Sequence, residues 1–222
     1  MLHHLSVSEA VAGTTAVLLL LVQLALFRSV VIAELIRLYA VQSLFVSFVC
    51  LAVGLTERSW DLIVLALLTF AFKVVGLPIY MQALVRNIST RVELPARINV
   101  MLSLLIAAAL IGVAILTSVQ LPLHEGAFLP QADLATCLSI VFVGFLLAIL
   151  RPNALAQIIG FLTLENGLFF GTVTLAPGLP FVIGILLLID VFVAVVVFAV
   201  LVRALVDRQD SAATDAFQRL RG

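Results

Sequence analysis

The chain has 222 residues, of which 64% are hydrophobic and 11% are charged, and its twelve basic and twelve acidic side chains give a formal net charge of zero. Its mean hydropathy of +1.30 is far above that of soluble proteins. This composition indicates an all-α integral membrane protein, excludes a large soluble catalytic domain, and argues against a polybasic surface for nucleic acid.

Stretches of low charge predict seven transmembrane helices, since about 20 apolar residues are needed to cross a bilayer. The predicted spans are 6–27, 38–55, 61–84, 98–120, 134–150, 153–176 and 180–204. We expect them to form one seven-helix membrane domain over residues 1–205. The remaining residues, 206–222, are expected to be a short polar tail.

Basic residues are distributed unevenly between the two ends of these spans. Only Arg58 falls on one side, and the single lysine, Lys73, lies within the third span. Ten arginines fall on the opposite side: Arg28, Arg37, Arg86, Arg91, Arg97, Arg151, Arg203, Arg208, Arg219 and Arg221. By the positive-inside rule, the N-terminus lies outside and the C-terminus is cytoplasmic. An even number of helices would scramble this asymmetry, so we expect seven spans.

The cysteines and histidines offer no cofactor site. Cys50 and Cys137 stand alone without a CxxC motif, which excludes iron-sulfur and nickel-iron ligation by this chain. A disulfide between them is possible, but burial as small apolar residues is the preferred interpretation. His3, His4 and His124 all fall outside the predicted spans, so no intramembrane pair exists to hold a haem. We expect this chain to bind no metal or other cofactor.

Lys73, Glu165 and Asp190 each lie near the middle of a predicted span. A charged side chain at a bilayer centre costs about 2.5 to 3.5 kcal/mol on insertion scales, whereas a leucine there gains only about 0.3 to 0.6 kcal/mol. These three residues are therefore candidates for proton or ion translocation. The alternatives are a static ion pair of Lys73 with either carboxylate, or a neutral Glu165 that hydrogen-bonds a neighbouring helix.

The surroundings of Lys73 predict a disturbed helix. Gly76 and Pro78 follow it closely and can open the helical hydrogen-bond ladder and admit water. The sequence therefore predicts a kinked site around Lys73.

The sixth predicted span has two specialised faces. At about 100° per residue, Gly160, Gly167 and Gly171 lie within about 20° of one line, which favours close helix packing. Glu165 projects about 140° away from that line. Asn166 is expected to hydrogen-bond a neighbouring helix. A helix with both features is expected to be enclosed by protein.

Four strings resemble the hydrogenase-4 component E family, the HyfE-like membrane subunits. They are Arg37 to Leu44 (RLYAVQSL), Lys73 to Pro78 (KVVGLP), Gly160 to Gly167 (GFLTLENG) and Ile189 to Ala194 (IDVFVA). The resemblance runs through nearly the whole chain. It implies a small subunit in the membrane arm of a group 4 hydrogenase or formate hydrogenlyase-type complex, related to respiratory complex I.

Residues 134–204 resemble the three-helix NuoK subunit of complex I and the MrpC subunit of multisubunit antiporters. NuoK carries Gly-Leu-Glu with an Asn four residues later. Aligning Gly160 and Asn166 with that pattern puts Leu162 at the NuoK Glu, while the carboxylate here is Glu165, about 4.5 Å further along the helix. Asp190 matches the Glu of the third NuoK helix. The displaced carboxylate favours component E over NuoK itself.

The expected function is that of a non-catalytic subunit in a redox-driven complex. Glu165 and Asp190 would load and release protons as the field of a nearby charge, such as that of Lys73, shifts. The resemblance implies antiporter-like and other membrane-arm subunits as partners, together with peripheral redox subunits that hold nickel-iron and iron-sulfur centres. Alternatives are a cation/proton antiporter subunit and an assembly subunit with static buried ion pairs.

Overall fold

The computed structural model describes residues 7–29, 31–86, 100–121, 130–151 and 153–175, together with Ile185 and Ile189. This part of the chain forms helices and no β-strand. The elements are α1 (Val7–Arg28), α2 (Ile32–Thr56), α3 (Trp60–Thr69), the π-helix η1 (Phe70–Gly76), α4 (Leu77–Arg86), α5 (Val100–Gln120), α6 (Pro130–Leu150) and α7 (Ala154–Leu175). Asp190, most of the predicted span 180–204 and the tail 206–222 lie outside the described residues.

Five described stretches are long and apolar enough to cross a membrane: Ile32–Thr56, Trp60–Ala83, Met101–Gln120, Ala132–Leu150 and Leu155–Leu175. Helix α1 contributes a shorter apolar stretch, Gly13–Arg28. The protein is therefore an α-helical, membrane-embedded chain. Seven spans and the orientation of the termini stay predictions.

Helix α2 begins six residues before the predicted span, at Ile32 instead of residue 38. Arg37, expected in the first loop, consequently lies within the helix with its side chain exposed. The prediction placed the start of the span after the charged residues. A helix can continue through charged residues, because its backbone hydrogen bonds do not depend on side-chain polarity. Leu35 and Ile36 are fully buried, so packing extends the helix past the purely apolar stretch. The other predicted spans within the described chain agree with the helices to within about four residues.

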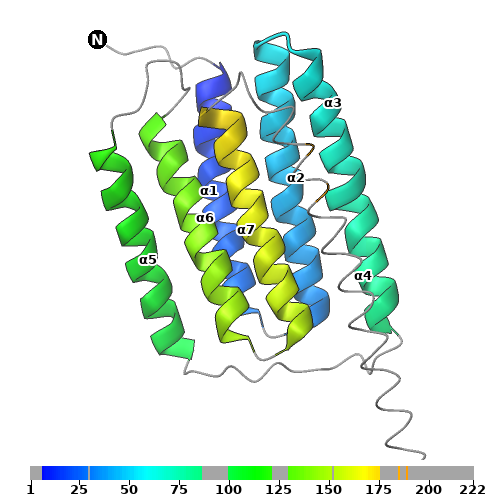
Figure 1. The fold of residues 1–222 in the computed structure, drawn as a ribbon, viewed down its shortest axis with the longest axis vertical. Coiled ribbons are helices and arrows are strands. Elements are labelled where there is room, and N and C mark those ends of the chain that lie inside the picture. The colour runs from blue at the N-terminus through cyan, green and yellow to red at the C-terminus, as the bar shows by residue number, and fades with distance from the viewer. Residues whose placement is uncertain are drawn as a thin grey trace, which may run out of the picture.

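The helices lie side by side (Figure 1), with α5 at one edge and the α3–η1–α4 segment at the other. Helix α5 packs on α6, and α3 and η1 pack on α2. Between these edges, α7 contacts both α6 and α2, while α1 also contacts α2 and α6. Helices α1, α2, α6 and α7 therefore form the centre of the described bundle.

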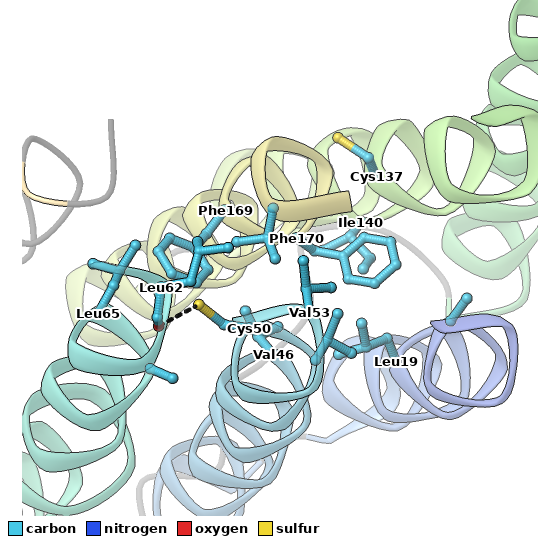
Figure 2. Packing of buried hydrophobic residues seen from close by; sticks show 14 residues of the cluster. Leu19, Val46, Cys50, Val53, Leu62, Leu65, Cys137, Ile140, Phe169 and Phe170 are labelled. Carbon is cyan, nitrogen blue, oxygen red and sulfur yellow. Dashed lines mark hydrogen bonds between the residues drawn. The ribbon is translucent and has the colours of Figure 1, made fainter. Parts of the chain in front are cut away.

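Two apolar clusters occupy different levels of this bundle. The first joins the end of α1 and the start of α2 to α4 and the start of α7: Leu26, Ile32, Leu35, Ile36, Tyr39, Leu77, Met81, Leu155, Ala156, Ile159 and Leu162. The second, shown in Figure 2, joins α1, α2, α3, α6 and the end of α7: Ala16, Leu19, Val46, Val49, Cys50, Val53, Leu62, Leu65, Ala66, Cys137, Ile140, Phe169, Phe170 and Val173. Both clusters are built from helices that are distant in sequence.

The glycine face of α7 lies against α6. A Cβ atom added at Gly160 would lie 2.6 Å from the backbone nitrogen of Ala148, and one at Gly171 would lie 2.5 Å from Cys137 Sγ. At Gly167 the added atom would meet the side chain of Ile140 at 2.9 Å. The small-residue spacing thus lets two helices approach more closely than larger residues would permit.

Both cysteines are free and buried. Cys50 Sγ donates a weak hydrogen bond to the carbonyl oxygen of Leu62 over 3.5 Å, as the dashed line in Figure 2 marks. Cys137 lies against Gly171 in the α6–α7 contact. The preferred interpretation of both as small buried apolar residues is therefore confirmed, and the disulfide is not formed.

Arg151, expected only as a loop residue that marks the cytoplasmic side, is buried in the short α6–α7 connection. Its Nη2 donates to the carbonyl oxygens of Phe27 and Ser29 over 2.9 and 2.6 Å. Desolvation lowers the pKa of Arg151, yet a guanidinium stays charged in proteins. A cation that donates to the last carbonyls of a helix complements its dipole. Arg151 therefore ties the C-terminus of α1 to the α6–α7 connection.

We predict that Gly160→Ala lowers the free energy of unfolding in detergent by about 1 to 3 kcal/mol, because the new methyl group would overlap the α6 backbone. Gly112→Ala in α5 is the matched control, since an added Cβ there meets nothing within 4 Å. Chemical unfolding curves of the purified variants measure both effects. Equal stability of the two variants would contradict the close α6–α7 contact.

Arg151→Met is expected to lower the free energy of unfolding by about 1.5 to 3 kcal/mol, since hydrogen bonds from a charged donor are lost. Arg37→Met, at an exposed position of α2, serves as the control for removal of one positive charge. The same unfolding measurement applies. An Arg151 variant as stable as the Arg37 variant would refute the capping role.

Candidate functional site

Lys73 lies in the π-helix η1, at the middle of the third predicted span. The backbone N–H of Leu77 donates to the carbonyl oxygen of Phe72, five residues earlier, as a π-helix requires. Pro78, at the second position of α4, has no N–H and so removes one regular helical bond. The disturbance predicted around Gly76 and Pro78 therefore takes the form of a wider helical turn that carries Lys73. Such turns are frequent at functional sites.

The Lys73 ammonium forms an ion pair with Glu165 of α7. Its Nζ lies 2.8 Å from Glu165 Oε1, and the two residues are 1% and 2% exposed. Nζ also donates to Asn166 Oδ1 over 3.4 Å and lies 5.6 Å from the centre of the Phe169 ring. This separation falls within the range of a cation–π contact. One buried cation thus links the η1 segment to three neighbouring positions of α7.

Amide side chains extend this ion pair toward α2 and α1. Asn166 Nδ2 donates to Ser43 Oγ over 2.9 Å and to Gln42 Oε1 over 3.3 Å. Gln42 Nε2 in turn donates to Gln23 Oε1 over 2.7 Å. The six residues Gln23, Gln42, Ser43, Lys73, Glu165 and Asn166, called here the polar network, come from four segments of the bundle. All of them are buried.

The polar network forms a layer between the two apolar clusters. On α7, Glu165 lies between Leu162 of the first cluster and Phe169 of the second. The same order holds on the other segments: Leu26, Gln23 and Leu19 on α1; Tyr39, Gln42 and Val46 on α2; Leu77, Lys73 and Ala66 on α4, η1 and α3. Apolar side chains above and below therefore shield the charges from water.

The arrangement is suited to holding and exchanging a proton. An ammonium and a carboxylate in a low-dielectric layer can exist as an ion pair or, after proton transfer, as a neutral pair, and small geometric changes shift the balance. The hydroxyl of Tyr39 is also close enough to interact electrostatically with Glu165. Within the described ranges, no group of three or more His, Cys, Asp or Glu side chains could hold a metal.

The structure brings together three of the residues that the sequence singled out, Lys73, Glu165 and Asn166, whereas Asp190 lies outside the described residues. The sequence alone predicts no role for Gln23, Gln42 or Ser43. Their signal was present, because Gln23 and Gln42 are long polar side chains inside predicted spans, where unpaired amides are unfavourable. Because they carry no charge, they do not stand out from the other residues of an apolar segment.

The ion pair predicts a large coupling between its two members. Lys73→Met or Glu165→Gln alone is expected to lower the free energy of unfolding by about 3 to 5 kcal/mol, because each leaves the other charged group buried without the opposite charge that it faces in the native protein. The double variant should lose much less than the sum. Unfolding in detergent measures all three, with Glu57→Gln at an exposed site as the control. Additive losses would show that the two side chains do not interact.

The likeness to hydrogenase-4 component E has the four sequence strings as its basis. Comparisons of the chain with protein-family models, curated proteins and solved structures found no match. The geometry of the polar network therefore provides the functional argument, and the family supplies a hypothesis about the complex.

Proposed function

We propose that this protein is a membrane subunit whose Lys73–Glu165 pair takes up and releases protons during ion translocation. The observation that supports the proposal best is the direct 2.8 Å contact between the two charged groups in a fully buried layer. Ionisable residues at such depth are expensive and mark ion pathways by default. Lys73 also lies on a π-helical turn, a feature that is frequent at functional sites.

The proposed mechanism uses the pair as a proton store. With Lys73 close, Glu165 stays ionised because the ammonium stabilises the carboxylate. When the neighbouring field changes or Lys73 moves away, Glu165 gains affinity for a proton, and the reverse change releases it. Asp190 is proposed as a second carboxylate of the same pathway. Water near Gly76 and Pro78 is proposed to carry protons between these stations.

The resemblance to component E extends the proposal to the complex. The subunit would belong to the inner-membrane arm of a group 4 hydrogenase or formate hydrogenlyase-type assembly. Redox subunits with nickel-iron and iron-sulfur centres would drive the charge movement, and antiporter-like subunits would continue the pathway. The chain itself would form and break no covalent bond apart from those to protons.

A static ion pair is the competing function, and the apolar clusters on both sides of the polar network are compatible with it. Shielding of this kind stabilises helix packing as well as it insulates a proton store. The two interpretations differ in what happens when the charge on Glu165 is removed while the helices stay assembled.

We predict that Glu165→Gln abolishes proton pumping by membrane vesicles of the native host, while the complex still assembles, because a neutral amide keeps an oxygen acceptor for Lys73 but cannot exchange a proton. Glu165→Asp should retain part of the activity. Quenching of a pH-sensitive dye measures pumping, co-purification measures assembly, and Glu57→Gln is the exposed control. Normal pumping by an assembled Glu165→Gln complex would reject the proton store and support the static ion pair. Purification without any redox subunit would favour the antiporter alternative.

A further inference from the structure

The hydrogen bonds of the polar network all point in one direction. Lys73 donates to Asn166, Asn166 donates to Gln42, and Gln42 donates to Gln23. An ammonium has only donors, so Asn166 must turn its oxygen toward Lys73. That orientation turns the Asn166 amino group toward α2, and the same reasoning fixes Gln42 and then Gln23. The cation on η1 therefore sets the orientation of an amide on α1.

The last amide in this series of hydrogen bonds, that of Gln23, has an unused donor. Gln23 Nε2 is buried and has no hydrogen-bond partner among the residues that the structure describes. An unpaired buried donor is unfavourable, and it is a direct consequence of the direction imposed at Lys73. Reversal of the chain would give Gln23 Nε2 an acceptor, because Gln42 would then present its oxygen to α1. Ser43 permits either direction, since a hydroxyl both donates and accepts.

We propose that Gln42 and Gln23 are positioning residues that transmit the charge state of Lys73 across α2 to α1 by reversal of this amide chain. If the pair releases a proton and leaves a neutral amine beside the Glu165 carboxylate, the lone pair of the amine accepts from Asn166, and the three amides turn together. Transfer of a proton from Lys73 to Glu165 leaves the chain unchanged, because the new Glu165 hydroxyl occupies that lone pair. The amide series therefore responds to loss of a proton from the ion pair and not to transfer of a proton within it.

Of the groups named here that face Lys73, only one connects it to the amides of α2 and α1. Glu165 is its ionic partner, Tyr39 interacts electrostatically with Glu165, and Phe169 offers only the face of its ring. Asn166 is thus the neutral contact that joins the cation to the other amides. Amides hold their protons firmly, so the chain carries orientation and not protons. Its use in ion translocation rests on the function proposed above.

Nuclear magnetic resonance of the side-chain amides tests the chain in the full-length protein in lipid nanodiscs. The sequence has eight glutamines, so selective ¹⁵N labelling gives few signals, and Gln23→Met assigns the one of interest. We expect the Gln23 signal to shift in Lys73→Met, which removes the imposed direction, and to stay unchanged in Lys73→Arg, which keeps a donor-only cation. In Gln42→Met, which breaks the chain but keeps the side-chain length, Lys73→Met should no longer move the Gln23 signal.

An identical Gln23 signal in the native, Lys73→Met and Lys73→Arg proteins would overturn the proposal, as would a shift that persists in Gln42→Met. If Lys73→Met does not fold, Lys73→Gln replaces it, because an amide at that position both donates and accepts. The readout is independent of transport. A Gln23 signal that depends on the residue at position 73, together with normal pumping by Glu165→Gln, would therefore reject the proposed function and retain the amide series. A Gln23 signal that does not depend on position 73 would reject the amide series alone.

Discussion

The buried contact between Lys73 and Glu165 is the interaction on which the described bundle depends. Each charge alone would be strongly unfavourable in an apolar layer, and the pair is tolerated because the two groups lie 2.8 Å apart with Asn166 and Phe169 beside the ammonium. The contact requires that η1 and α7 keep a fixed depth and rotation relative to each other. A shift of either segment by one residue would rotate its charged side chain by about 100° around the helix axis and break the contact.

Close helix packing meets that requirement from the other side of α7. Gly160, Gly167 and Gly171 bring α7 against α6, and Arg151 fastens the connection between these helices to the end of α1. With one face of α7 held by backbone contact, the opposite face presents Glu165 and Asn166 to η1 and α2. The wider turn of η1 then places the single lysine at the level of the carboxylate. Packing and charge placement are thus two consequences of one helix orientation.

The sequence predicts the depth of a residue within a membrane span better than it predicts which neighbouring helix its side chain faces. The positions of Lys73 and Glu165 within apolar spans follow from hydropathy, and the glycine face of α7 follows from residue spacing. That α6 receives this face, and that Lys73 meets Glu165, depends on helix rotation set by contacts distant in sequence. The π-helix adds a local change of register that no apolar pattern encodes. Gln23 and Gln42 escaped notice because uncharged amides barely alter a hydropathy average, although their pairing is specific to this fold.

Proton exchange by the Lys73–Glu165 pair can be tested directly, because the protein has a single lysine. Lysine labelled with ¹⁵N at Nζ gives one signal, whose chemical shift reports both its own protonation and the ionisation of its partner. If the pair exchanges protons, this signal changes with pH while the protein in nanodiscs stays folded, and Glu165→Gln displaces or removes the change. A signal that is constant over the whole pH range in which the protein is folded, with or without Glu165→Gln, would identify a static ion pair and contradict proton exchange by the pair.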